Sequence, residues 1–127
     1  MQEIQIIFYP KTSNSVTLNC EVAKTITEKM NGLMNRENLA VDKGMIFPFL
    51  LPWIRFFWMK NVKIPLDIIF INRNLEIIAT YEAPVETGFF HKNYWSHGFC
   101  KYVIETNIGF CKKHNIVKGT KIKISRK

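Results

Sequence analysis

The sequence lacks any run of about 18 consecutive apolar residues, the length that a membrane-spanning helix requires. Charged side chains interrupt even its most hydrophobic region, at Arg55, Lys60, Lys63 and Asp67. Its first residues, MQEIQIIFYPK, also lack the basic and long apolar segments of a signal peptide. We therefore expect a protein that does not span a membrane, and these features leave its compartment open.

Cysteine is scarce as well, with Cys20, Cys100 and Cys111 as its three occurrences. Three scattered cysteines cannot build a disulfide framework, and an odd number leaves at least one free thiol in a monomer. Free thiols favour a reducing compartment, so the cysteine content points toward the cytoplasm.

The same cysteines raise the alternative of a metal site. The pairs His97-x-x-Cys100 and Cys111-x-x-His114 have the ligand types and the spacing of structural zinc sites. Cys100, however, continues the alternation of the strand pattern KYVIE, as a core residue does, and free cysteine is among the most buried residue types. We therefore predict no metal and no cofactor.

Acidic residues are few, ten against eighteen basic ones, which gives a net charge of +8. Lysine outnumbers arginine by 14 to 4, and Ile, Lys and Asn, which have AT-rich codons, make up 42 of the 127 residues. Base composition thus accounts for much of the charge, which is weak support for nucleic-acid binding.

From Lys112 onward the chain holds seven basic residues and no acidic one. Alternation in TKIKISRK places Lys121 and Lys123 on the solvent face of a last strand, where lysine also prevents edge-to-edge aggregation. A nucleic-acid accessory role through this basic face remains the alternative.

At 127 residues, 47% of them hydrophobic and 13% aromatic, the chain is large enough to bury a core as one domain. Thr25 and Glu28 form a capping-box pattern that predicts a helix from Thr25 to Asn31, with Gly32 as its stop. A second short helix is expected from Ile108 to His114, capped by Asn107. Alternating or apolar runs predict about eight strands, at residues 3–8, 16–22, 45–49, 53–59, 67–71, 75–82, 101–106 and 120–127.

The connections between these strands carry further signals. Pro48 predicts an edge position or a bulge within its strand. The turn NRN, residues 72–74, predicts an antiparallel hairpin with a three-residue loop. Residues 83–98 have no clean period and predict a long surface loop, and such loops are often functional. The pattern as a whole predicts an antiparallel sandwich or barrel.

The stretch FFWMKNVKIPLDIIFI, residues 56–71, places polar groups inside the most apolar region. In a structural interpretation, Asn61 and Asp67 bond to turn amides and Trp58 belongs to the core. In a functional interpretation, Trp58 is the apolar wall of a pocket and Asn61 and Asp67 bind ligand hydroxyls. Arg36 and Lys60 would then bind a carboxylate or phosphate.

The loop FFHKNYWSHGFC, residues 89–100, is the second candidate region because it offers Tyr94, Ser96 and His97. No G-x-S-x-G motif surrounds Ser96, and a serine next to a histidine does not form a nucleophile–base pair, so hydrolase chemistry is not indicated. Aromatic side chains on such a loop contact sugars or proteins, or cover the sandwich.

Five segments follow one another in the order and spacing of a known family: GLMNRENL, GMIFPF, FWMKNVKIPLDIIFI, KYVIETNIG and NIVKGTKI. Over about Val16 to Ile124 the chain resembles the domain of unknown function 192 family. The resemblance implies a compact, mostly β fold of the jelly-roll kind. It also implies bacterial or archaeal relatives that are often exported, so a trimmed periplasmic form is an alternative to a cytoplasmic one. It implies no activity.

This chain departs from the family pattern at two places. Relatives often carry two cysteines in the loop that matches residues 83–97, where this chain has none. They often have Gly-Asp where this chain has Gly119 and Thr120. A redox role of the loop is therefore not expected here.

We thus predict a single mainly β domain over residues 1–127, an antiparallel jelly-roll-like sandwich or barrel with one or two short helices, that binds a small polar ligand. The predicted ligand-binding residues are Arg36, Trp58, Lys60, Asn61, Asp67, Tyr94, Ser96 and His97. Besides nucleic-acid binding, the second alternative is an enzyme that uses Asp67 or His97 as an acid or base, in a reaction that the sequence does not identify.

Overall fold

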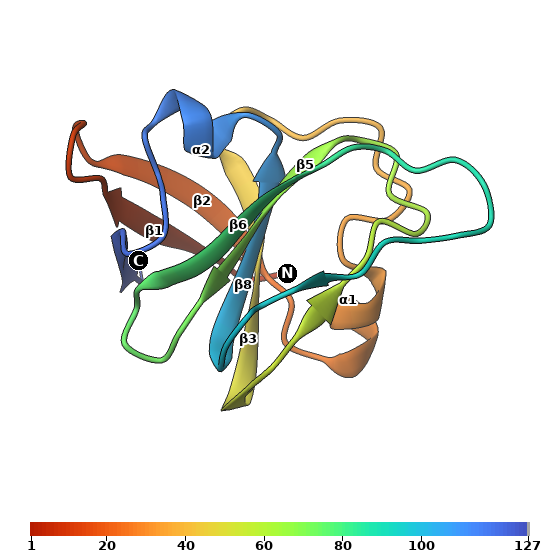
Figure 1. Cartoon of the computed structure of the whole chain (residues 1–127), viewed down its shortest axis with the longest axis horizontal. Helices are drawn as coiled ribbons and strands as arrows, with labels where there is room; N and C mark the ends of the chain where they lie inside the picture. The colour runs from red at the N-terminus through yellow and green to blue at the C-terminus, as the bar shows by residue number, and fades with distance from the viewer. Residues whose placement is uncertain (127) are drawn as a thin grey trace.

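The computed structural model describes residues 1–126 and is built mainly of strands, as expected (Figure 1). Within this range there are two short helices, α1 (Ile26–Asn31) and α2 (Phe110–Lys113). The strands are β1 (Glu3–Tyr9), β2 (Val16–Val22), β3 (Lys43–Trp53), β4 (Phe56–Phe57), β5 (Leu66–Ile71), β6 (Ile77–Ala83), β7 (Tyr94–Trp95), β8 (Cys100–Asn107) and β9 (Lys121–Ser125). No helix in this range has the length and hydrophobicity that crossing a membrane requires.

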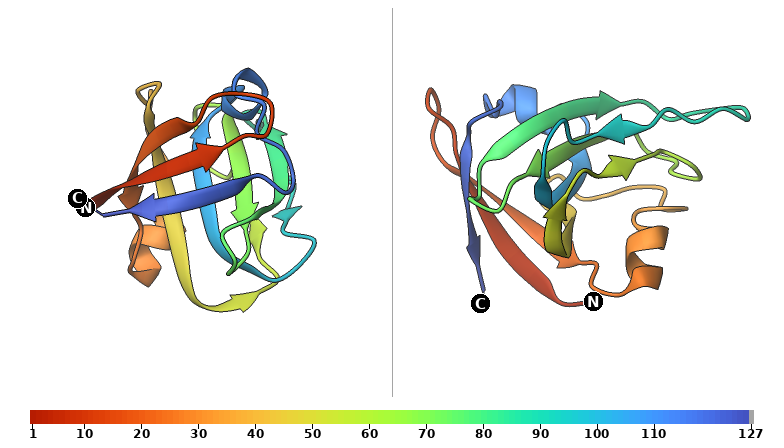
Figure 2. Two further views of the ribbon diagram at one scale, coloured as in Figure 1. Left: turned by 90° about the vertical axis from the view of Figure 1, so that its left-hand side faces the viewer. Right: turned by 60° about the horizontal axis from the view of Figure 1, so that its bottom comes forward.

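The main sheet has seven strands in the order β6-β5-β8-β3-β2-β1-β9 and curls into a half-barrel (Figure 2). Neighbouring strands are antiparallel except β2 and β3, which run parallel. Its two edges approach each other at one end, where Glu76 forms a bridge with Lys121 and the Ile77 amide donates to the Thr120 carbonyl. The prediction of a mainly β fold with one or two short helices is confirmed. The jelly-roll arrangement is not confirmed.

Side chains pack on both faces of the curled sheet. An inner cluster, which includes Ile6, Leu18 and Ile104, draws on all seven strands of the main sheet and fills the curl. An outer cluster, which includes Phe47 and Val103, lies on the other face of β3, β5, β6 and β8. Strand β5 is buried along its whole length because it contributes to both clusters. The candidate site lies above the outer cluster.

The predicted strand at residues 53–59 is wrong. The segment 53–59 is not one strand, because β3 continues to Trp53 and only the two residues of β4 pair afterwards, with β7. Apolar side chains occur on both alternating faces of this segment, so its sequence gave no sign of the break. The Pro48 prediction is confirmed, since the β3–β8 register shifts just after Pro48 and the β2–β3 pairing ends at Ile46.

The predicted β5–β6 hairpin is antiparallel, as expected, but its loop is longer than three residues. Strand β6 begins only at Ile77, because the Asn72 side-chain oxygen accepts from the amides of Asn74 and Glu76 and holds the turn. Leu75 takes a positive φ of 61° within it.

Helix α1 follows its sequence signals. The Thr25 hydroxyl accepts from the Glu28 amide and the Glu28 carboxylate accepts from the Thr25 amide, so the capping box is formed. Gly32 ends the helix at φ +46°, and a Cβ there would lie 3.3 Å from the Phe47 ring and 3.7 Å from a Glu105 carboxylate oxygen. Glycine therefore lets the end of α1 lie directly over the outer face of the sheet.

The predicted cap of the second helix is wrong. Asn107 belongs to β8, and its side-chain amide donates to the carbonyls of Leu39 and Ala40. The Asp67 carboxylate replaces it, accepting from the amides of Gly109 at 3.2 Å and Cys111 at 2.8 Å. A short helix without a side-chain cap of its own is thus held by a carboxylate from β5.

Candidate functional site

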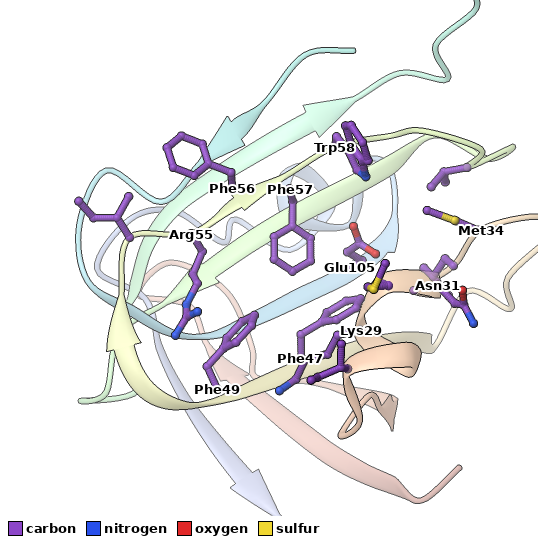
Figure 3. Close-up of a pocket in the computed structure, with 16 residues that line it drawn as sticks. Lys29, Asn31, Met34, Phe47, Phe49, Arg55, Phe56, Phe57, Trp58 and Glu105 are labelled. Carbon is purple, nitrogen blue, oxygen red and sulfur yellow. The ribbon is translucent and has the colours of Figure 1, made fainter.

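An open groove of about 640 Å³ lies between α1 and β4, above the outer cluster (Figure 3). Five aromatic side chains supply much of its lining: Phe47, Phe49, Phe56, Phe57 and Trp58. Most of the other lining residues are apolar, among them Met30, Leu33 and Met34, which come from α1 and the turn that follows it. We call this feature the aromatic groove.

The walls of the aromatic groove follow from strand alternation and aromatic packing. Alternation along β3 turns Phe47 and Phe49 to the outer face. The Phe57 ring from β4 packs edge-on against both, at centroid distances of 5.0 and 6.4 Å. Such edge-to-face pairs fix ring orientation, so contacts within the protein hold the wall in place. Phe56 and Trp58 remain 61% and 46% exposed at the rim.

Glu105 lies at the floor of the aromatic groove. It follows Val103 on the outer face of β8 and is only 3% exposed. No side chain or backbone group in residues 1–126 forms an ion pair or hydrogen bond with its carboxyl group. Burial without a compensating charge raises the pKa of Glu105 to about 8. The carboxyl group is therefore mostly protonated at neutral pH.

Two cations mark the opposite end of the groove. The Lys29 Nζ lies 4.8 Å, and the Arg55 guanidinium carbon 3.9 Å, from the centre of the Phe49 ring. Arg55 donates to the Leu51 carbonyl at 2.6 Å, whereas its Nε is buried and has no hydrogen-bond partner in the described chain. Partial burial and the nearby Arg55 charge lower the pKa of Lys29. Neither cation forms an ion pair within residues 1–126, so this end is electropositive.

Of the residues predicted from the sequence, Trp58 lines the aromatic groove. Lys60 lies next to it, with its Nζ 5.3 Å from the centre of the Trp58 ring. Asn61 is exposed in a turn at φ 60°, where its carbonyl accepts from the Asn35 amide. These neighbours stand at the edge of the groove and are not part of its lining.

Arg36 and Asp67 lie outside the groove and are engaged by the protein itself. The Arg36 guanidinium forms a two-point ion pair with Glu21, at 2.5 and 3.1 Å. Asp67 is buried and holds α2, as described above. The structural interpretation of Asp67 as a residue that bonds backbone amides accounts for its position.

The loop residues Tyr94, Ser96 and His97 do not line the groove either. Tyr94 is buried against the Tyr81 ring, at a centroid distance of 5.4 Å. The Ser96 hydroxyl accepts from the Arg55 amide at 3.0 Å and donates to the Gly98 carbonyl at 2.6 Å. Ser96 therefore fixes the backbone that carries Arg55.

The residues of the zinc site and of the nucleic-acid surface that the sequence raised as alternatives do not come together in the described part of the structure. Cys111 belongs to the inner cluster and Cys100 to the outer one, and no group of three or more His, Cys, Asp and Glu side chains in residues 1–126 is arranged to hold a metal ion. Lys121 and Lys123 are exposed on the edge strand β9, as predicted. Strand β9 and the aromatic loop between β6 and β7 lie at opposite ends of the molecule (Figure 1).

Sequence reasoning missed Glu105, Lys29 and Arg55. Glu105 shares a strand face with Lys101 and Val103, so alternation alone gives no sign that it is buried. The available signal was a carboxylate directly after the apolar run YVI. The cations gave no local signal, because α1 and the β3–β4 connection meet only in the folded chain.

Comparisons with known proteins give a fold and a family. The structure is similar to a crystal structure from Sinorhizobium meliloti, described as a "putative transcription regulator", with a TM-score of 0.88 and 27% identity over 97% of this chain and 94% of that one. A protein of unknown function from Novosphingobium aromaticivorans is also similar, with a TM-score of 0.88 and 29% identity over 97% of this chain and 86% of that one.

No curated protein matches the sequence. The family model of domain of unknown function 192, described as "Uncharacterized ACR", matches residues 9–124. That match covers nearly the whole length of the chain and agrees with the resemblance seen in the sequence. The protein therefore belongs to the domain of unknown function 192 family.

Proposed function

We propose that the protein is a binding module for a small amphipathic organic molecule, whose apolar body lies in the aromatic groove. The observation that carries this proposal is an open, aromatic groove of about 640 Å³ with few polar groups along it. Ligand sites commonly have volumes of about 300–1,000 Å³, mainly apolar walls and a small number of convergent polar groups.

The lining changes the chemistry expected of the ligand. The sequence predicted a small polar ligand, but three of the proposed polar contacts, Arg36, Asp67 and Ser96, are engaged within the protein. The groove instead presents aromatic faces, with Glu105 at one end and Lys29 and Arg55 at the other. A ligand with an apolar body and a polar group at an end fits this arrangement better.

Binding is a better proposal than catalysis. The residues predicted as an acid or base, Asp67 and His97, both lie outside the aromatic groove. The His97 ring packs on Trp95, at a centroid distance of 3.8 Å. Glu105 is the carboxyl group inside the groove, and no Ser, Thr, Cys or His side chain of residues 1–126 lines the groove with it.

A neutral aromatic probe tests the proposal. We expect 3-phenylpropan-1-ol, titrated into the isotopically labelled protein, to shift the backbone amide NMR signals of α1, β4 and Phe47. Trp58→Ala should weaken this binding about ten-fold, which corresponds to about 1.4 kcal/mol, because it removes one aromatic wall.

Trp53→Ala is the matched control. Trp53 is similarly exposed and stacks on Phe99, outside the groove, at a centroid distance of 5.6 Å. Binding of the probe should be unchanged in this variant. If the probe and its naphthyl analogue bind nowhere, or bind equally well to both variants, the proposed function is wrong.

A further inference from the structure

We infer that the floor of the aromatic groove is an ammonium subsite, in which the Glu105 carboxylate pairs with a protonated amine at one end of the ligand. This inference rests on the proposed function, because it assigns a chemical class to the ligand of the same groove. It goes further by predicting that the cationic end of the ligand lies at Glu105.

The position of Glu105 is set by the middle of the main sheet. Its backbone pairs with Met45 of β3 and Ile68 of β5, so the side chain projects from the middle of the sheet and not from an edge. Figure 3 shows the carboxyl group pointing into the space bounded by Phe57, Phe47 and Met34. The residue is only 3% exposed, and its carboxyl group forms no hydrogen bond or ion pair with another group of residues 1–126.

Burial of Glu105 costs folding free energy, since its carboxyl group has lost much of its hydration without gaining a hydrogen bond within residues 1–126. A ligand that brings a donor to this point recovers that loss. The carboxyl group also opens toward the groove and away from the sealed inner cluster. Glu105 is therefore placed to recognise a group that the protein itself does not supply.

An ammonium group fits this position better than a neutral donor, for two reasons. It pairs with the carboxylate at low local dielectric, where such a pair is strengthened. It is also attracted by the faces of the surrounding aromatic rings, as in other ammonium sites with aromatic walls. A neutral hydroxyl group gains neither effect in full.

The other charged groups of the groove orient the ligand. Lys29 from α1 and Arg55 from the β3–β4 connection are the charged lining residues besides Glu105 among residues 1–126. Both cations lie against the Phe49 ring. Phe49 is four residues along β3 from Met45, the backbone partner of Glu105. Along the strand, Phe49 and Met45 are therefore roughly 13 Å apart, at about 3.3 Å per residue. Lys29 and Arg55 repel a cation from that end and leave the Glu105 end for it.

Binding of the amine then displaces one proton. The free carboxyl group is mostly protonated at pH 7, and the amine arrives protonated, because its pKa is near that of lysine. Pairing converts the carboxylic acid to a carboxylate, and its proton leaves to the buffer. No covalent bond changes, and a ligand with a hydroxyl group in place of the amine releases no proton.

Calorimetric titration of 3-phenylpropylamine and 3-phenylpropan-1-ol, in phosphate and in Tris at pH 7, tests the inference. We expect the amine to release about 0.9 proton per molecule bound and the alcohol none. The affinity of the amine should rise about ten-fold from pH 6 to pH 7, as the ionised fraction of Glu105 rises, while that of the alcohol stays constant. Glu105→Gln should abolish the proton release and weaken the amine at least ten-fold, with less than a three-fold effect on the alcohol.

Glu82→Gln is the matched control, since Glu82 is exposed on β6 and pairs with Lys112 outside the groove. Alcohol binding without tighter, pH-dependent amine binding would overturn the inference and leave the proposed function standing. Amine binding without proton release would overturn it as well. The pH series on the unaltered chain decides the question even if Glu105→Gln does not fold. If neither probe binds, the proposed function fails together with the inference.

Discussion

The free energy of unfolding should fall as pH rises from 5 to 8, and the variant Glu105→Gln should show much less of this fall. The perturbation is close to isosteric, because glutamine keeps the shape of the protonated acid and cannot ionise. In the folded chain the pKa of Glu105 is raised from 4.5 to about 8 by burial. In the unfolded chain the same group ionises near its ordinary value.

The sign follows from proton linkage. Between pH 4.5 and about 8 the folded chain holds a proton that the unfolded chain has released. The contribution of protonated Glu105 is therefore fully present below about pH 4.5 and is lost as pH rises toward 8. At about 1.4 kcal/mol per pH unit over the three units from pH 5 to 8, the loss in unfolding free energy is at most about 4 kcal/mol.

Urea denaturation gives the unfolding free energy of the parent protein and of Glu105→Gln at pH 5 and at pH 8. The change between the two pH values in the parent, minus the same change in the variant, is the contribution of Glu105. Other titrating groups cancel because both proteins share them. Glu82→Gln should keep the pH dependence of the parent, since Glu82 is exposed and paired with Lys112. Equal losses in the parent and in Glu105→Gln would refute the reasoning and show that Glu105 is solvated or paired in the folded chain.

Three further substitutions test residues that we assign to the fold. Arg36→Ala should cost about 1–2 kcal/mol in urea denaturation, and much less when Glu21→Gln is already present, because the two form one ion pair; additive losses would argue against that pair. Asp67→Ala should cost about 3 kcal/mol, since the amides of Gly109 and Cys111 lose their acceptor at the start of α2; thermal melts unchanged within error would mean that α2 does not depend on Asp67. Gly32→Ala should cost about 1–2 kcal/mol at its positive φ, and a stabilised variant would contradict the backbone described here.

Much of the fold could be predicted from local pattern. Strand β2 shows plain alternation, and α1 has a complete capping box between Thr25 and Glu28. The prediction failed at residues 53–59, where apolar side chains occupy both alternating sets and give no period. It also failed at the cap of α2, because Asp67 lies more than 40 residues before the amides that it accepts from.

The candidate site was less accessible to sequence reasoning. Trp58 was identified because it stands beside polar residues in an apolar stretch. Glu105, Lys29 and Phe47 come from β8, α1 and β3, and only the folded chain brings them together. Glu105 was hidden for a further reason, since it shares its strand face with Lys101, whose amine donates to the Phe49 carbonyl at 2.7 Å. In a sequence, a buried and unpaired glutamate cannot be told from a glutamate on a solvent-exposed strand face.

The most direct test of the account is an NMR titration of the Glu105 carboxyl carbon, in protein labelled at its glutamate side chains, with and without 3-phenylpropylamine. We expect a pKa near 8 in the free protein and a pKa lowered to below about 5 when the amine is bound, because the cation stabilises the carboxylate. A pKa near 4.5 in the free protein, or a raised pKa that the amine leaves unchanged, would contradict it.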